Sequence, residues 1–207
     1  KNNGEEDLGV EYVSSFALLG IDKEGLLSTD EKLEVLIARN AWQKELIWNR
    51  FSMDQLGMSI SQPDKVRRSS QTISVGNTGN WSTKNYLPMG CLKNKETDSI
   101  LFWQIEQNGS WYWEISDQDG HMYLQLSGPT EHQSHWWKNL KPGDTFASVP
   151  VSVGSACGDV EEAAGELTKY RRAIRRKNED NEKLPVIFND YMNCLWGDPT
   201  TEIGRAS

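Results

Sequence analysis

The hydrophobic residues of this chain recur mostly at every second position, which is the period of a β-strand with one buried face. The alternation is clearest over residues 99–127, where three apolar runs are separated by the turn sequences Asn108-Gly109 and Asp119-Gly120. Turns of this kind join antiparallel strands. We therefore predict a meander of three antiparallel strands in this region.

The N-terminal part of the chain has further β-rich stretches at residues 10–20 and 33–51. In the second stretch the apolar residues Trp42, Leu46 and Trp48 are separated by even numbers of positions. Even spacing places side chains on the same face of a strand. We expect these three residues to share one face.

The period changes near the C-terminal end of the β-rich region. A last strand is predicted over residues 144–154, and Pro150 within it has no N–H to donate, which indicates an edge strand or a bulge. Over residues 159–176 the apolar positions instead follow the period of a helix. Asp159 and Glu162 form a capping pattern at its start, so we predict an amphipathic helix there.

A different kind of strand is predicted after a polar hinge at residues 177–183. Residues 184–189 (LPVIFN) are apolar without alternation, as in parallel strands that are buried on both faces. A helix-capping sequence follows at 197–202, so the segment is typical of the opening of an α/β barrel. Functional residues of such barrels follow the strands, which makes these residues candidates for a binding site: Asn189, Asp190 and Tyr191.

The tryptophans are the second group of candidate binding residues. The chain has nine of them. We expect Trp103, Trp111 and Trp113 to pack in the core, because alternation places them among Ile and Leu. Trp136 and Trp137 are adjacent, so in an extended segment they point in opposite directions, and one of them is available for a ligand or an interface.

Charge and composition exclude several functions. The chain has 22 Lys and Arg against 30 Asp and Glu, a formal charge of −8, so nucleic acids and anionic membranes are not expected partners. Three cysteines without a CxxC pair favour reduced thiols and a cytoplasmic location. His132 and His135 have no third ligand in a matching pattern, so neither a metal nor another cofactor is expected. No apolar run reaches about 18 residues, the length of a membrane span.

Several long stretches resemble the α-galactosidases of glycoside hydrolase family 36. They are FWQIEQNGSWYWEISD, LQLSGPTEHQSHWWKNLKPGDTFASVPV, LTKYRRAIRR and LPVIFNDYMNCLWGDPTTE, and they occur in order along nearly the whole chain. The resemblance implies a mainly β fold, an antiparallel β-supersandwich of the galactose-mutarotase type. One α-helix and the first strand of an incomplete (β/α)8 barrel would follow it. The implied domains are residues 1–157 (part of the supersandwich), 158–183 (linker helix and hinge) and 184–207 (start of the barrel).

The resemblance also implies a function for the complete protein. Enzymes of this family hydrolyse terminal α-galactosides such as raffinose and melibiose by a retaining mechanism with two carboxylates. Both carboxylates lie on later barrel strands, so we expect this chain to be a piece of a longer protein and inactive alone. Tyr191 matches a tryptophan that walls the galactose pocket in many members. The family also implies a homo-oligomer assembled through the β domain, with Trp81 and Trp136 as candidate interface aromatics.

A function of a different class, a non-enzymatic module, is also consistent with the sequence. A β-sandwich rich in aromatic residues is also consistent with a stand-alone module that binds carbohydrate or assembles subunits, without chemistry of its own. The coding sequence downstream distinguishes the two, because it either continues into a barrel with catalytic carboxylates or does not. In either case we expect residues from about 178 onward to contribute little to the stability of the β-sandwich, because the neighbours that would cover a barrel strand are missing from the chain.

Overall fold

The structure is a computed structural model that describes residues 1–58, 71–118 and 120–186. The chain divides into two units, Lys1–Lys169 and Tyr170–Ser207. The first unit holds the β-strands, and the described part of the second holds the end of one helix and a further short helix.

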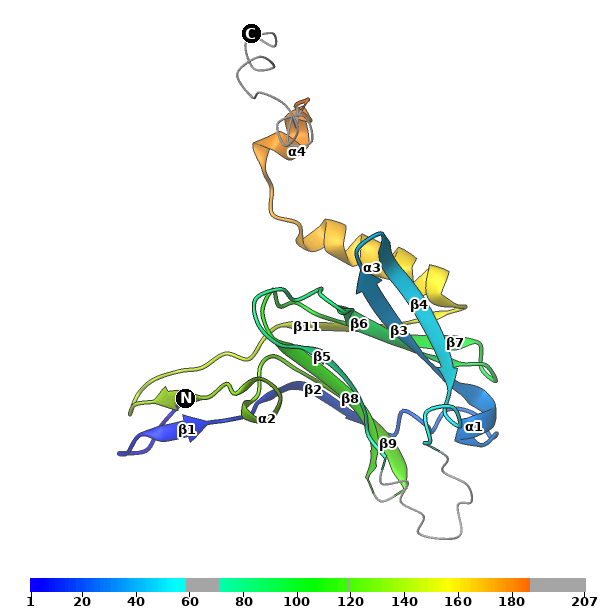
Figure 1. The fold of residues 1–207 in the computed structure, drawn as a ribbon, viewed down its shortest axis with the longest axis horizontal. Coiled ribbons are helices and arrows are strands. Elements are labelled where there is room, and N and C mark those ends of the chain that lie inside the picture. Colours follow the sequence, from blue (N-terminus) through cyan, green and yellow to red (C-terminus); the bar gives the residue numbers. More distant parts are fainter. Residues whose placement is uncertain (59–70, 119, 187–207) are drawn as a thin grey trace. The chain divides into compact units, whose positions relative to one another are not determined.

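The first unit is built from two antiparallel sheets that face each other (Figure 1). The five-stranded sheet has, in spatial order, β11 (Val151–Cys157), β7 (Ser99–Ile105), β6 (Tyr86–Asn94), β3 (Leu33–Ala41) and β4 (Lys44–Ser52). The four-stranded sheet has β2 (Ser14–Leu19), β9 (His121–Ser127), β8 (Trp111–Gln118) and β5 (Ile73–Asn77). A two-stranded arm pairs β1 (Leu8–Val10) with β10 (Lys138–Leu140).

Four helices accompany the strands in the described residues. They are α1 (Thr29–Lys32), α2 (Glu131–Ser134), α3 (Val160–Ile174) and α4 (Glu179–Lys183). None of them is long and apolar enough to cross a membrane.

The main hydrophobic core lies between the two sheets. As predicted, Trp103, Trp111 and Trp113 are buried there, together with aliphatic side chains from both sheets. The mainly β, antiparallel fold expected from the alternation is confirmed. This core holds the sheets in register and so positions the side chains on their outer faces.

A second, smaller core lies on the outer face of the five-stranded sheet, where α3 packs. Ala163 and Leu167 of the helix contact a cluster that includes Leu36, Cys91 and Phe102. The predicted helix is confirmed, and so is part of its capping. The Glu162 carboxylate accepts a hydrogen bond of 2.8 Å from the backbone N–H of Asp159.

The predicted three-stranded meander is wrong in one respect. Strands β8 and β9 do form a hairpin, with Tyr112 opposite Ser127 and Gln118 opposite His121. Strand β7, however, pairs with β6 and β11 in the other sheet. Residues 106–110 therefore connect the two sheets instead of forming a hairpin turn. Alternation identifies the buried face of a strand but does not identify its sheet, because both sheets bury a face in the same core.

The stretch 33–51 is also not one strand but the hairpin β3–β4. Trp42 and Gln43 form its turn, with Gln43 at a φ of 60°. Trp42 is 88% exposed there. The prediction that Trp42, Leu46 and Trp48 share one strand face is therefore wrong, because Trp42 lies in the turn and not in a strand. The positive φ of Leu46, 52°, further interrupts the even spacing.

Two other expectations are partly corrected. The strand expected over 144–154 begins only at Val151, directly after Pro150, and β11 is an edge strand, as the proline indicated. The polar hinge 177–183 contains the short helix α4, whose N-cap Asn178 accepts a hydrogen bond from the N–H of Asp180 at 3.1 Å. Of the barrel strand expected at 184–189, residues 184–186 are described and form no strand, and Leu184 ends α4 in the left-handed conformation with a φ of 45°. Residues 187–189 lie outside the described residues, so the start of a barrel stays a prediction.

Candidate functional site

The polar residues expected at the end of a barrel strand, Asn189, Asp190 and Tyr191, lie outside the described residues. Their role in a binding site stays a prediction. The candidate sites that the structure describes are therefore on the β-sandwich. They are formed by exposed aromatic residues and by two clefts along the outer face of the four-stranded sheet.

Trp81 lies in the loop that follows β5 and is 62% exposed. Two hydrogen bonds hold this loop: Asn77 donates its side-chain amide to the carbonyl of Trp81 at 2.6 Å, and the Trp111 indole N–H donates to the carbonyl of Ser82 at 2.6 Å. The backbone is thus anchored while the Trp81 ring faces solvent, which suits an aromatic contact with a ligand or a subunit.

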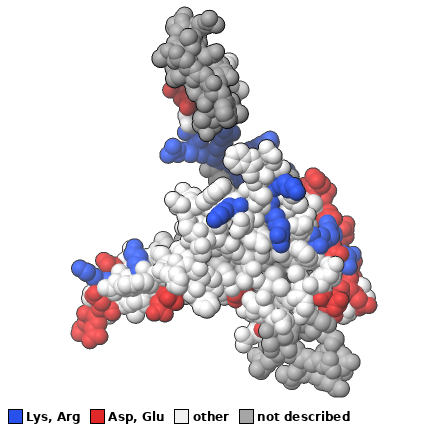
Figure 2. Space-filling view, viewed as in Figure 1, with Lys and Arg blue, Asp and Glu red and all other residues white. Residues whose placement is uncertain are grey.

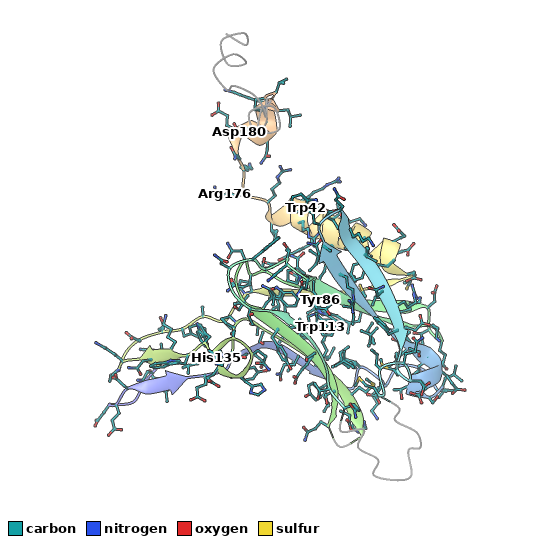
Figure 3. The ribbon with its side chains drawn as sticks, viewed as in Figure 1. Trp42, Tyr86, Trp113, His135, Arg176 and Asp180 are labelled. Carbon is teal, nitrogen blue, oxygen red and sulfur yellow. The ribbon has the colours of Figure 1, made fainter. Side chains whose placement is uncertain are left out.

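The adjacent tryptophans of the segment after α2 have different surroundings. Trp136 is partly buried and its ring packs on Phe146, with centroids 5.4 Å apart, whereas Trp137 is 64% exposed. His135, which precedes them, ends α2 in the left-handed conformation with a φ of 51° (Figure 3). Of the two, Trp137 is therefore the one available for a ligand or an interface.

The first cleft has a volume of about 310 Å³ and lies between residues 74–85 and the loop 128–134. Polar side chains dominate its lining, among them Asn77, Lys84, Asn85 and Gln133. Amides, which both donate and accept hydrogen bonds, suit a polar uncharged ligand better than an apolar one.

A tyrosine–carboxylate cluster, formed by Tyr12, Tyr112, Glu114 and Tyr123, lies beside this cleft. Both oxygens of the Glu114 carboxylate accept a hydrogen bond from a phenol: Tyr123 donates to Oε1 at 2.8 Å, and Tyr112 donates to Oε2. Tyr12 lines a cleft together with Glu114. The carboxylate is consequently held in one orientation by two neighbours on the sheet.

The surroundings keep these phenols protonated. Burial, and then the charge of Glu114, raise the pKa of Tyr12 to about 12. Burial and the hydrogen bond to Glu114 also raise the pKa of Tyr112 and of Tyr123. At neutral pH the hydroxyls of Tyr112 and Tyr123 are therefore protonated and donate their hydrogen bonds to the Glu114 carboxylate.

The second cleft, the tyrosine–carboxylate cleft, has a volume of about 300 Å³ and is lined by Tyr12, Tyr112, Glu114, Gln125 and His132, with further residues of α2 and of the loop before β2. It shares three lining residues with the first cleft: Tyr112, Thr130 and Gln133. The two clefts are thus adjacent along the same side of the sandwich.

Reasoning from the sequence missed this cleft. It followed the apolar positions of residues 111–127 to the core and left aside the alternate positions, Tyr112, Glu114, Tyr123 and Gln125. The alternation places these four residues on the outer faces of their strands, which is the signal that the sequence carries. Which of these side chains lie together depends on the strand register, which the pattern does not reveal.

Charged side chains are distributed unevenly over the surface. Asp and Glu side chains gather around α1, and the arm formed by β1 and β10 carries both acidic and basic side chains (Figure 2). The tyrosine–carboxylate cleft is lined by Glu11, Glu114 and Glu131, whereas Lys84 lines the first cleft. Within the described residues, no group of three or more His, Cys, Asp or Glu side chains is placed to hold a metal ion. His132 and His135 therefore have no third ligand in this part of the chain.

Comparisons with known proteins find no matching protein family and no matching curated sequence. Solved structures do match. A variant α-galactosidase of glycoside hydrolase family 36 from Geobacillus stearothermophilus, in complex with stachyose, has a TM-score of 0.64 at 14% identity and covers 87% of this chain and 22% of its own. The α-galactosidase from Lactobacillus brevis has a TM-score of 0.62 at 14% identity and covers 83% of this chain and 20% of its own.

A third match is the galactosidase domain of an α-galactosidase–sucrose kinase, with a TM-score of 0.56 at 19% identity over 75% of this chain and 19% of its own. The chain thus spans about a fifth of the length of the solved structures that it matches. At these identities the likeness shows a shared fold: the β-sandwich of this chain is the fold of one region of the family 36 α-galactosidases.

Proposed function

We propose that this chain is the non-catalytic N-terminal portion of an α-galactosidase-like glycoside hydrolase. The observation that carries the proposal is the fold match, which extends over 75% to 87% of this chain for α-galactosidases from different sources. The resemblance of the sequence motifs adds to the proposal, because it extends to residues 184–202, where the family has its first barrel strand.

The complete enzyme would hydrolyse terminal, non-reducing α-galactosides of the raffinose and melibiose type. One of the matching structures contains stachyose and another contains raffinose, which supports oligosaccharides of this kind as substrates. A retaining hydrolysis needs a nucleophilic carboxylate and a second carboxyl group about 5 Å away as acid and base. Both would come from later strands of the barrel.

The residues of this chain would contribute to binding and assembly. Tyr191, with Asn189 and Asp190, would form one wall of the galactose pocket, where an aromatic ring covers the C–H face of the sugar. The exposed rings of Trp81 and Trp137 would contact a ligand or a neighbouring subunit in a homo-oligomer.

A cytoplasmic location is part of the proposal. Cys91 and Cys157 are free thiols; the first is buried under α3 and the second is exposed. Burial raises the pKa of the Cys91 thiol to about 12, so it is unreactive. Free thiols of this kind are typical of proteins that fold in a reducing compartment.

A stand-alone carbohydrate-binding or subunit-assembly module is the second candidate function. It is favoured by one observation, the tyrosine–carboxylate cleft, because a binding surface on the sandwich needs no barrel. The two candidates differ in whether catalytic carboxylates follow in the same reading frame.

The test is to clone the reading frame through its natural stop codon and to assay the product on an aryl α-galactoside, an aryl N-acetyl-α-galactosaminide and raffinose. We expect hydrolysis of the α-galactoside and of raffinose, with the sugar released first as the α-anomer by NMR, as retention requires. A reading frame that stops without a barrel, or a complete protein without glycosidase activity, would overturn the proposal in favour of the module.

A further inference from the structure

We propose that the tyrosine–carboxylate cleft on the β-sandwich binds a neutral oligosaccharide. The cleft lies within the first unit, between the four-stranded sheet, α2 and the loop before β2. The inference does not depend on the barrel, on residues 187–207 or on the hydrolytic activity proposed above.

The strand register places the cleft residues on one rigid face. Glu114 lies directly opposite Gln125 of β9 and Ser74 of β5. Tyr112 is two residues before Glu114 on the same strand, so it shares the outer face, and Tyr123 is the diagonal neighbour of Glu114 on β9. Binding groups that are built on paired strands are positioned before the ligand arrives, which reduces the entropy cost of binding.

The charge of the lining excludes anions. The carboxylates of Glu11, Glu114 and Glu131 line the cleft, and its described lining contains neither Lys nor Arg. A phosphate, a sulfate or a uronic acid would be repelled at this position. The ligand is therefore neutral or cationic.

The hydrogen-bonding groups favour a neutral ligand over a cation. Of the three carboxylates, those of Glu11 and Glu131 are exposed to solvent, which screens their charge, and each oxygen of Glu114 already accepts a phenol hydrogen bond. The amides of Gln125 and Gln133 and the hydroxyl of Thr130 line the same cleft. Amides and hydroxyls both donate and accept hydrogen bonds, and so do the hydroxyl groups of a sugar.

An accessible aromatic ring completes the arrangement. Tyr12 lines the cleft and is 43% exposed. An exposed phenol ring beside hydrogen-bonding groups can cover the C–H face of a sugar ring while the polar groups bind its hydroxyls. A cleft of about 300 Å³ is at the lower end of small-molecule sites, which suits one or two sugar rings.

The experiment titrates the purified 207-residue chain with raffinose, glucuronate and tetramethylammonium, following amide and side-chain NMR shifts. We expect saturable binding of raffinose, with shifts at Gln125 and around α2, and no saturable binding of the other two probes. Tyr12→Ala and Glu114→Gln should each weaken raffinose binding at least about tenfold, which corresponds to about 1.4 kcal/mol.

The matched control is Trp42→Ala, which removes a more exposed aromatic ring from the turn of the other sheet. It should leave raffinose binding unchanged. Thermal unfolding of each variant separates lost binding from lost folding. If Glu114→Gln does not fold, Tyr12→Phe replaces it in the comparison with Tyr12→Ala. Tyr12→Phe keeps the ring and should retain most of the raffinose affinity.

Saturation by tetramethylammonium would assign the cleft to a cation, and equal weakening by Trp42→Ala would show non-specific stacking. Either result, or the absence of raffinose binding, would overturn the inference. The titration does not depend on catalytic activity. A negative titration would therefore not contradict the proposed glycosidase function, and a negative glycosidase assay would not contradict oligosaccharide binding in the cleft.

Discussion

The indole rings of Trp103 and Trp113 meet edge to face, with centroids 5.1 Å apart and planes at 77°. Trp103 belongs to β7 and Trp113 to β8, so this contact joins the two sheets. Both side chains are fully buried, and neither indole N–H has a hydrogen-bond partner in the part of the chain that the structure describes. The pair therefore stabilises the sandwich through packing alone.

Trp113→Ala should reduce the free energy of unfolding by about 3 to 5 kcal/mol, because it opens a cavity between the sheets. Denaturant unfolding followed by circular dichroism measures the loss. Trp113→Phe should cost less, since it keeps an aromatic ring and removes a buried N–H that has no hydrogen-bond partner among the described residues. An unchanged midpoint for Trp113→Ala would contradict the assignment of this residue to the core.

Two Gly→Ala substitutions should have opposite effects. A Cβ at Gly90 would lie 2.5 Å from Cζ2 of Trp103, its direct partner on β7, so Gly90→Ala should destabilise the protein by about 1 to 3 kcal/mol. Gly165 lies within α3 with open space around the added atom, and Gly165→Ala should stabilise the protein by about 0.5 to 1 kcal/mol. Melting temperatures that move in the same direction for both would contradict this account of the packing.

Arg50 should make stability dependent on acid pH. It binds Glu34 at 2.8 Å and Asp159 at 2.6 Å, and so connects the five-stranded sheet to the start of α3. Burial alone would raise the pKa of both carboxyls, but the hydrogen bonds, from Arg50 above all, outweigh it and lower each pKa below its ordinary value of about 4. A carboxyl whose pKa is lower in the folded than in the unfolded state stabilises the protein at pH values above the unfolded-state pKa. This stabilisation is lost as the pH falls through the folded-state pKa.

Arg50→Met should therefore lower the melting temperature at pH 7, and the difference from the original protein should shrink as the pH falls below about 4. The effect at pH 7 is modest, because Arg50 and Asp159 are partly exposed. Lys169→Met, which removes an exposed ion pair with Glu166, is the control. It should change neither the melting temperature at pH 7 nor its dependence on pH. A difference that stays constant from pH 7 to pH 3 would show that Arg50 acts through packing and not through these carboxyls.

Deletion of residues 178–207 should leave the melting temperature nearly unchanged and improve solubility. The buried residues of the two described hydrophobic clusters end at Leu167, and the chain divides into its two units after Lys169. Differential scanning calorimetry of the truncated chain is the measurement. Unfolding of residues 1–177 after the deletion would show that the C-terminal segment is an integral part of the sandwich.

The pattern of the sequence predicted what depends on local periodicity. The β8–β9 hairpin and α3 follow from alternation and from the change of period, and the buried tryptophans follow from their place among Ile and Leu. It could not assign β7 to its sheet, because the side chains of both sheets alternate toward the same core. It also could not show that Trp42 occupies a turn, because the turn residues carry no Gly or Pro.

The candidate site was less predictable than the fold. Tyr112 and Glu114 share a strand, but their proximity to Tyr123 and Gln125 depends on the pairing of β8 with β9. The contribution of Tyr12 depends on the path of the chain before β2. Long-range register is a property of the folded core, so these contacts are visible only once both sheets are assembled.

The central claim is that this chain is the non-catalytic part of an α-galactosidase-like enzyme. Release of nitrophenol from an aryl α-galactoside, measured side by side for the 207-residue chain and for the complete reading frame, tests it most directly. The account predicts turnover by the complete protein and none by the chain alone. Turnover by the chain alone that is abolished by Asp190→Asn, or a complete protein inactive on α-galactosides, would contradict it.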